Sequence, residues 1–260
     1  MSGMGRRILI TGGKGGVGKT TVTANLGLTL NAKGASVLLV DGDIGLNNLD
    51  VVMRAEEKIL YDIGDLARGK ATLSQCLVDL GDKLRLLPSM TACSAFVTTE
   101  IFREICLKAA EIFDYVLIDS PAGVEDSFLR AASGADESII VATPHLASVR
   151  DGYKTGKILS SLGFTRQGLI INRIRGDFVM DKTMLDAKEI AGAVKLPLYG
   201  VIPEDDSVNV YGLIDVTDKK SPSAYSYGLI ADYLGGGDKK LYDYLHPYKG
   251  LMGFLKRKLK

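Results

Sequence analysis

The chain has 260 residues, of which 46% are hydrophobic and 24% are charged, with a formal net charge of +1 and a mean hydropathy of +0.13. A chain of this size and composition can bury a large core, and we expect one large globular domain. The near-zero charge excludes a global basic field for nucleic acid, and the three cysteines, with no C-x-x-C pair, argue against a disulfide framework or a metal cluster.

Short apolar runs alternate with helical patterns along most of the chain. The run after MSGMGRR is too brief for a signal peptide or a membrane span, and we expect the first strand there. The predicted strands cover residues 6–11, 35–41, 83–88, 114–120, 137–144, 167–172 and 196–203, and the predicted helices cover residues 18–33, 99–111, 146–161, 181–193 and 221–234. This alternation predicts the α/β class, with a doubly wound, mostly parallel sheet and helices on both faces. Ligands of such sheets bind outside the carboxyl ends of the strands.

The segment GKGGVGKTT follows the first predicted strand and opens the first predicted helix. It fits the pattern G-x-x-x-x-G-K-[ST], in which backbone N–H groups and the helix N-terminus close around phosphate oxygens. We expect Lys19 to hold the β- and γ-phosphates of a nucleotide and the Thr20 hydroxyl to ligate Mg²⁺. The candidate phosphate-binding residues are Gly13, Lys14, Gly15, Gly16, Val17, Gly18, Lys19, Thr20 and Thr21.

Lys14 is a second lysine, near the start of this loop. From there its side chain should point away from the phosphates held by Lys19, so it is poorly placed to serve the nucleotide of its own subunit. It could serve the nucleotide of a neighbouring subunit, like an arginine finger that neutralises charge developing at the γ-phosphate. The alternative is an ordinary solvated lysine.

Carboxylates follow two of the predicted strands. Asp119 ends an apolar strand, a place from which a carboxylate can hold Mg²⁺ through its water shell, although a turn role is the alternative. Asp41 and Asp43 follow an earlier strand, and Gly42 and Gly45 suit a loop that reshapes when a γ-phosphate leaves.

The chain ends with GLMGFLKRKLK, which combines apolar and basic residues without an acidic one. At about 100° per residue, Leu251, Leu255 and Leu259 share one helical face, while Lys256 and Arg257 point away from it. Such an end predicts a membrane-surface helix, and a helix for a partner's groove or a frayed tail are the alternatives. The candidate membrane residues are Leu251, Met252, Phe254, Leu255, Lys256, Arg257 and Leu259.

The motifs taken together resemble those of one family. KGGVGKTT at 14–21 resembles the deviant Walker A signature of the ParA/MinD family of P-loop ATPases. DGDIGLNNLD at 41–50 resembles the family's switch I segment, and DSPAG at 119–123 resembles its Walker B and switch II segment. SVRD at 148–151 and IPED at 202–205 resemble segments of the division-site members in particular, as does the basic amphipathic end.

The resemblance implies roles for single residues. It implies that Lys14, Lys19 and Asp43 are catalytic, with Lys14 completed by dimerisation in the ATP state and Asp43 near the attacking water. The implied Mg²⁺ environment is Thr20, Asp43 and Asp119, with the carboxylates acting through water. The implied switch residues are Asp41, Asn47, Asn48, Pro121 and Gly123, the implied adenine contacts are Asn172, Arg173, Pro203, Glu204 and Asp205, and Asp151 is the implied partner contact. Asn47 departs from the family pattern, because many division-site members carry a basic residue there.

The resemblance also implies a function. It implies a slow ATPase, activated by a partner, that forms a homodimer with ATP and Mg²⁺, associates with the anionic inner face of the cell membrane and helps to position the division septum. The division inhibitor MinC and the activator MinE are the implied partners, and hydrolysis would release the protein. The predicted organisation is a P-loop ATPase domain over 1–234, a hinge and linker over 235–249 and a membrane-targeting helix over 250–260.

Two other functions share these motifs. A MinD-like regulator of flagellar number combines them with membrane contact, and a ParA-type chromosome or plasmid partition ATPase binds DNA through a basic surface. The basic residues here cluster in the amphipathic tail, which suits lipid better than duplex, so no specific nucleic acid is expected. Relatives of the nitrogenase iron protein are excluded, because this chain has Ala122 and Gly123 where they carry a cluster-binding cysteine.

Overall fold

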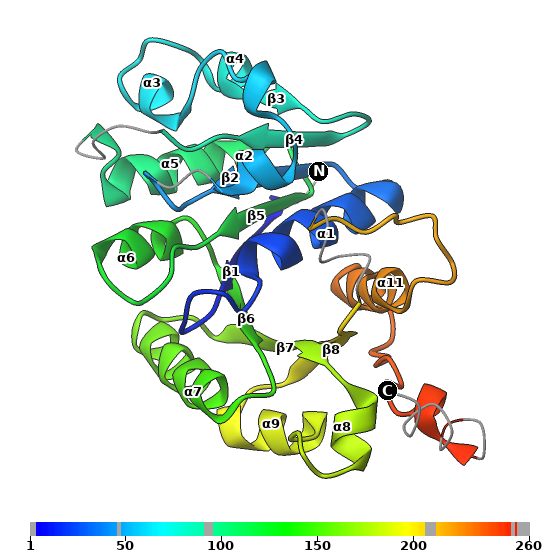
Figure 1. Ribbon diagram of the computed structural model, residues 1–260. Coiled ribbons are helices and arrows are strands. Elements are labelled where there is room, and N and C mark those ends of the chain that lie inside the picture. Colours follow the sequence, from blue (N-terminus) through cyan, green and yellow to red (C-terminus); the bar gives the residue numbers. More distant parts are fainter. Residues whose placement is uncertain (1–3, 46–47, 91–95, 206–211, 251–252, 254–260) are drawn as a thin grey trace.

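One sheet organises the computed structural model, which describes residues 4–45, 48–90, 96–205, 212–250 and 253. Within these ranges the sheet has eight strands in the order β3-β4-β2-β5-β1-β6-β7-β8 (Figure 1). The strands are β1 (Arg6–Thr11), β2 (Val37–Asp41), β3 (Val78–Asp79), β4 (Leu84–Leu87), β5 (Tyr115–Asp119), β6 (Glu137–Ala142), β7 (Arg166–Ile174) and β8 (Leu198–Pro203). Every neighbouring pair is parallel except β3 and β4, which confirms the predicted mostly parallel sheet.

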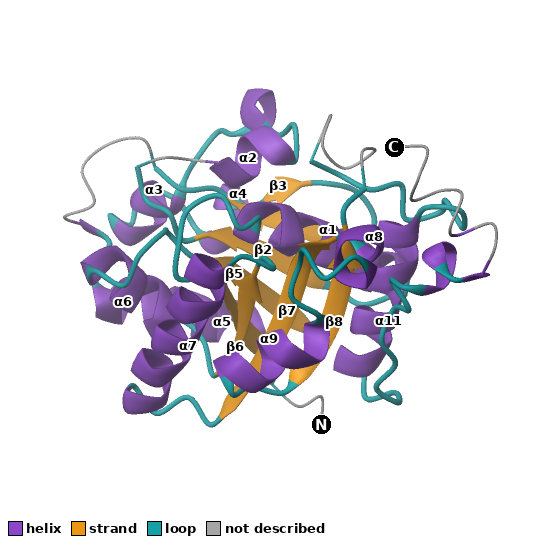
Figure 2. Cartoon of the chain, turned by 60° about the horizontal axis from the view of Figure 1, so that its bottom comes forward, coloured by secondary structure: helices purple, strands orange, loops and turns teal. Residues whose placement is uncertain are grey.

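Helices cover both faces of the sheet (Figure 2). They are α1 (Lys19–Ala32), α2 (Asn48–Val52), α3 (Ile63–Ala67), α4 (Leu73–Cys76), α5 (Thr99–Ala110), α6 (Asp126–Ser133), α7 (Leu146–Ser161), α8 (Gly176–Met180), α9 (Ala187–Val194) and α11 (Pro222–Leu234), with short 3₁₀ turns at Glu56–Lys58 (η1) and His246–Tyr248 (η3). Alternation along β1 sends Leu9 to the core under α5, α6, α7 and α9, and sends Ile8 and Ile10 to the core under α1 and α11. The central strands are therefore buried on both faces, which explains their unbroken apolar sequences.

Helix α9 begins later than the predicted helix over 181–193. The Asp186 side chain accepts hydrogen bonds from the backbone N–H groups of Lys188 and Glu189, and Glu189 bonds back to the Asp186 N–H. This capping box fixes the first turn at Ala187, and a separate short helix, α8, lies before it. The prediction was wrong at this boundary because the cap outweighed the apolar pattern.

The prediction missed elements that are short or lack local signals. Helix α6 has eight residues and no side-chain cap, yet its Phe128 is completely buried against the sheet. Strand β3 has two residues and pairs antiparallel with β4 at the sheet edge. None of the helices in the described ranges is long and apolar enough to cross a membrane.

We expect Gly134→Ala to destabilise the fold, because its methyl group would lie 2.7–2.9 Å from Cys106 Sγ, Phe102 Cε1 and Ile118 Cδ1. All three neighbours are fully buried, so the overlap cannot be relieved toward solvent. We expect the free energy of unfolding, measured by urea denaturation, to fall by about 1–3 kcal/mol. Gly228→Ala is the matched control, since nothing lies within 4 Å of the added atom in α11. There the better helix propensity of alanine should stabilise by up to about 1 kcal/mol. Equal effects at both positions would contradict this packing.

Candidate functional site

The loop between β1 and α1 exposes the start of a helix. Gly16 and Gly18 have φ values of 80° and 94°, the left-handed region that favours glycine, and Gly18 is the N-cap of α1 without a capping side chain. The first N–H groups of α1 are therefore available to an anion. The nine candidate phosphate-binding residues, Gly13 to Thr21, all belong to this turn or to the first turn of α1, and Lys14 is exposed.

Lys19 lies at the buried side of the loop, with 9% of its surface exposed. Burial lowers the pKa of its amine, and the nearby carboxylates Asp119 and Asp43 oppose that decrease. The amine therefore lies near two of the predicted acidic residues. A charged group in this position can neutralise anionic oxygens on a ligand.

The carboxylate of Asp119 is almost completely buried. It ends β5, and the Thr20 hydroxyl donates to its Oδ2 at 2.6 Å while the Thr23 hydroxyl approaches its Oδ1 at 3.3 Å. Thr23 was missed from the sequence, although its i, i+3 spacing from Thr20 places both on one helical face. Burial raises the pKa of Asp119 to about 7; the Thr20 hydrogen bond opposes the rise and the Asp41 charge adds to it.

Asp41 lies beside Asp119, because β2 and β5 pair in parallel with these two residues in register. The backbone N–H groups of Asp43 and Leu49 donate to its two oxygens at 3.0 and 3.2 Å, which ties the ends of the candidate switch loop to β2. Burial raises the pKa of Asp41 to about 7, an effect that these hydrogen bonds oppose. Asp43 is half-buried near Lys19, and burial raises its pKa while Lys19 lowers it.

The remaining candidate switch and partner residues lie on different elements of the site. Asn48 is exposed at the start of α2, Pro121 is buried after β5, and Gly123 has a φ of 87°, whereas Asn47 lies outside the described residues. Asp151 of α7 packs directly on the phosphate loop, since a Cβ at Gly13 would lie 2.5 Å from the Asp151 Cβ and 2.6 Å from its carbonyl oxygen. All the candidate membrane residues, Leu251, Met252, Phe254, Leu255, Lys256, Arg257 and Leu259, lie outside the described residues.

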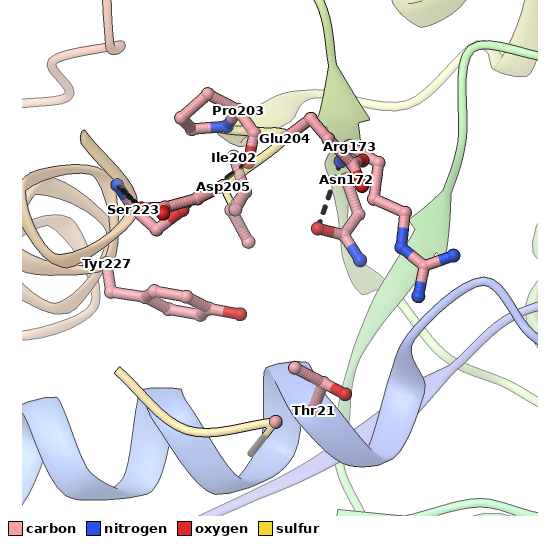
Figure 3. Close-up of a pocket in the computed structure, with 10 residues that line it drawn as sticks. Thr21, Asn172, Arg173, Ile202, Pro203, Glu204, Asp205, Ser223 and Tyr227 are labelled. Atoms are coloured by element: carbon pink, nitrogen blue, oxygen red, sulfur yellow. Dashed lines mark hydrogen bonds between the residues drawn. The ribbon is translucent and has the colours of Figure 1, made fainter. Parts of the chain in front are cut away.

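The candidate adenine contacts meet in one cavity of about 120 Å³ (Figure 3). It is lined by Thr21, Asn172, Arg173, Ile202, Pro203, Glu204, Asp205, Gly212, Ser223 and Tyr227. Tyr227 reaches from α11 toward Thr21, and Asn172 and Arg173 lie across the cavity from α11 (Figure 3). Sequence reasoning missed Tyr227, because nothing in a single helical tyrosine distinguishes a pocket wall from ordinary core.

Asn172 joins this cavity to the phosphate loop. Its Nδ2 donates to the Val17 carbonyl oxygen at 2.9 Å, and its Oδ1 accepts from the Arg173 backbone N–H at 3.0 Å. A Cβ at Gly18 would lie 2.4 Å from the same Nδ2, so glycine is required there for this approach. The phosphate loop and the cavity are thus adjacent compartments of one site.

The acidic groups suit Mg²⁺ bound together with a nucleotide. In the described ranges no group of three or more His, Cys, Asp and Glu side chains forms a metal cage of its own. Mg²⁺ usually keeps several waters and binds one or two carboxylates together with substrate phosphates. The Thr20 hydroxyl and the Asp119 carboxylate could supply the protein part of such a ligand set. Burial raises the pKa values of Asp41 and Asp119 more than their hydrogen bonds lower them. A bound cation would favour the charged carboxylates and so lower both pKa values.

Comparisons with known proteins agree with this geometry. Residues 8–212 match the family model described as the CobQ/CobB/MinD/ParA nucleotide binding domain. The chain is 38% identical to the septum site-determining protein MinD of Bacillus subtilis over 97% of both chains. The solved MinC:MinD cell division protein complex of Aquifex aeolicus is 36% identical, with a TM-score of 0.84 over 92% of this chain and 99% of that one. MinD of Pyrococcus horikoshii, solved with Mg-ADP, is 28% identical, with a TM-score of 0.79 over 89% and 96% of the chains.

Without nucleotide and Mg²⁺ we expect the protein to lose stability between pH 5 and pH 8. The folded-state pKa values of Asp41 and Asp119 are raised to about 7, above the unfolded value, so their stabilising contribution is complete at low pH and is lost as pH rises through about 7. One pKa unit corresponds to about 1.4 kcal/mol, and we expect at least that loss in urea unfolding.

Asp119→Asn should reduce this pH dependence, and Asp238→Asn, an exposed change of the same chemistry, should leave it intact. An increase in wild-type stability between pH 5 and pH 8 would contradict the raised pKa values of Asp41 and Asp119.

Proposed function

The chain belongs to the CobQ/CobB/MinD/ParA nucleotide-binding family and is a MinD-type ATPase that uses ATP and Mg²⁺, and from this premise we propose how it works in the cell. It acts in septum site determination as a nucleotide-timed membrane protein: ATP joins two copies, the dimer holds a division inhibitor at the membrane, and hydrolysis releases it. The observation that carries the proposal is the Thr20–Asp119 hydrogen bond beneath the open N-terminus of α1, with Lys19 alongside.

The phosphate loop binds and orients the nucleotide. Its N–H groups surround the phosphate oxygens, Lys19 contacts the β- and γ-phosphates, and Asn172 and Pro203 border the base. Bound Mg²⁺-ATP supplies the transferable phosphoryl group and a cation that neutralises its charge. Thr20 and Asp119 would hold this Mg²⁺, Asp119 through water.

Asp43 positions the attacking water. Phosphoryl transfer needs little proton abstraction, so a half-buried carboxylate serves by orienting water rather than as a strong base. Asp41 supports this role by holding the N–H groups of Asp43 and Leu49. When the γ-phosphate leaves, the backbone from Gly42 to Gly45 would rearrange.

Lys14 completes the site of a second copy. It is exposed in the phosphate loop, whereas Lys19 is buried, and an exposed cation at this point of the loop suits a role across an interface. Two copies joined through their nucleotides would each receive the partner's lysine. Dimerisation in the ATP state then follows from the charge of the γ-phosphate region.

The C-terminal residues bind an anionic membrane. In the proposed organisation residues 1–234 are the ATPase domain, 235–249 a linker and 250–260 an amphipathic helix on the inner face of the cell membrane. Each buried CH₂ contributes about 0.8 kcal/mol and each basic residue about 1 kcal/mol, against an ordering cost of roughly 1 kcal/mol or more per residue. One tail binds weakly, whereas two linked tails gain roughly 10²–10⁴ in avidity.

The protein partners are a MinC-like inhibitor and a MinE-like activator. The related Aquifex aeolicus protein was solved in a MinC:MinD complex, which supports the first of these. Asp151 is the proposed contact residue, and its packing on Gly13 would carry a partner's effect to the phosphate loop. The resemblance to the family supports the MinE-like activator.

Lys14→Ala should separate nucleotide binding from dimerisation. Because Lys14 is exposed and Lys19 serves the nucleotide of the same subunit, the Kd for Mg-ADP should change by less than about twofold, within 0.4 kcal/mol. The ATP-dependent dimer should disappear in sedimentation velocity, and hydrolysis should fall with it. A loss of ADP affinity of tenfold or more would place Lys14 in its own subunit's site instead.

Vesicle sedimentation tests the membrane proposal. We expect the protein to pellet with anionic liposomes in Mg-ATP but not in Mg-ADP, because only the dimer presents two tails. Leu255→Glu should abolish pelleting by placing a charge on the apolar face of the tail. Leu162→Glu, the same change at a 46% exposed leucine after α7, is the control and should pellet normally. Pelleting equal in ATP and ADP, or ATP-dependent DNA binding without liposome binding, would contradict the proposal.

A further inference from the structure

The segment between Asp238 and Gly250 packs against the body beside α8 (Figure 1). The Tyr244 hydroxyl accepts a hydrogen bond from the Ala187 N–H, the first residue of α9, at 3.1 Å. A Cβ at Gly176 would lie 1.9 Å from the Tyr244 carbonyl oxygen and 2.8 Å from the Tyr248 ring, so the backbone of the segment lies directly on the first residue of α8. We call residues 238–250 the C-terminal strap.

The seat of the strap and the base cavity are built on the same strand end. Asn172, which lines the cavity, and Gly176, which carries the strap, are separated by three residues at the end of β7. Between them, the Ile174 carbonyl oxygen accepts from the Glu204 N–H at 3.0 Å, and Ile174 pairs with Pro203 of β8. Displacement of the strand end would therefore move both the cavity wall and the strap.

We call the cavity of about 120 Å³ that holds the candidate adenine contacts the base cavity, and its Pro203–Glu204 side the wall. A second cavity, of about 260 Å³, lies between this wall and the strap. Pro203 and Glu204 line both this cavity and the base cavity, while Tyr242, Tyr244 and Tyr248 line it from the strap side. Pro203 and Glu204 thus form a thin partition, with the base cavity on one side and strap tyrosines on the other.

The N-terminal turn of α11 also connects the base cavity to the strap. Asp205, in the base cavity, accepts from the Ser221 hydroxyl at 3.0 Å and the Ser223 N–H at 3.3 Å, which fixes the first turn of α11. Tyr225 of that helix packs edge-on against Tyr242 of the strap, with 6.2 Å between ring centroids. The strap therefore contacts α8, α9 and α11, and residues of α8 and α11 line the same cavities as Pro203 and Glu204.

We propose that the C-terminal strap is a positioning element of the nucleotide site: it supports the Pro203–Glu204 wall from behind, so that binding of the base and docking of the strap strengthen each other. This rests on the proposed nucleotide function and deepens it. Tyr244 acts as a positioning residue through this wall and touches no reacting atom. Because the coupling is a binding free energy, each event must strengthen the other by the same factor.

Gly176→Ala in the full chain tests the proposal, since the methyl group would displace the strap from α8 while leaving the phosphate loop untouched. We expect the Kd for Mg-ADP, measured by calorimetry, to weaken by about fivefold or more, within the usual range of such couplings. The Kd for Mg-pyrophosphate, which has phosphates and no base, should change by less than about twofold. Gly192→Ala, a helical glycine of α9 with open space around its Cβ, is the matched control and should leave both values unchanged.

Two further measurements protect the test against misfolding. Tyr244→Phe keeps the ring and removes only the acceptor for the Ala187 N–H, and it should produce a smaller loss with the same selectivity for Mg-ADP. In the wild type, Mg-ADP should slow tryptic cleavage after the exposed Lys239 and Lys240 at the start of the strap, followed by mass spectrometry, and Mg-pyrophosphate should not.

The outcomes separate this inference from the proposed function. If Gly176→Ala weakens Mg-ADP and Mg-pyrophosphate equally, or weakens neither, the strap does not act through the base wall and the inference is overturned. Protection of Lys239 and Lys240 that is the same with both ligands would overturn it too. A wild-type protein that fails to bind Mg-ADP at all would instead contradict the nucleotide function itself.

Discussion

The site depends on one electrostatic problem, the burial of two carboxylates side by side. Asp41 and Asp119 stand in register at the ends of β2 and β5, almost without exposure to solvent. Hydrogen bonds from Thr20 and from the N–H groups of Asp43 and Leu49 compensate part of this cost, and the charge of Lys19 compensates a smaller part of it at Asp119. The remaining cost is what a divalent cation with a phosphate ligand would remove, so the apo protein is electrostatically prepared for Mg-nucleotide.

The sheet order explains why these groups meet. Placing β5 between β1 and β2 brings the phosphate loop, Asp119 and the switch loop to one edge of the sheet, although they are far apart in sequence. The next strands, β6, β7 and β8, carry α7, Asn172 and the Pro203–Glu204 wall to the other side of the loop. In the proposed function, the phosphates of a nucleotide would therefore contact the side of the site that carries Asp43, and the base would contact the strand ends beneath the C-terminal strap.

Local signals account for what could be predicted from sequence. The phosphate loop, the apolar central strands and Asp119 at the end of β5 each depend on a short stretch of chain, and a single sequence contains that information. The start of α9 depended on the Asp186 cap, which the apolar pattern of 181–193 concealed. Tyr227 and the seating of Tyr244 on Gly176 depend on contacts between segments distant in sequence, and no local pattern encodes them.

The most direct test of this account is the effect of Mg²⁺ on ADP-induced stabilisation, measured by thermal unfolding of the wild type and Asp119→Asn at matched nucleotide saturation. In the wild type, Mg²⁺ should add clearly to the stabilisation by ADP, because the cation removes the charge burden on Asp119 and Asp41. In Asp119→Asn that increment should be largely lost. An equal Mg²⁺ increment in both proteins would contradict the central claim that the buried carboxylates prepare the site for the metal.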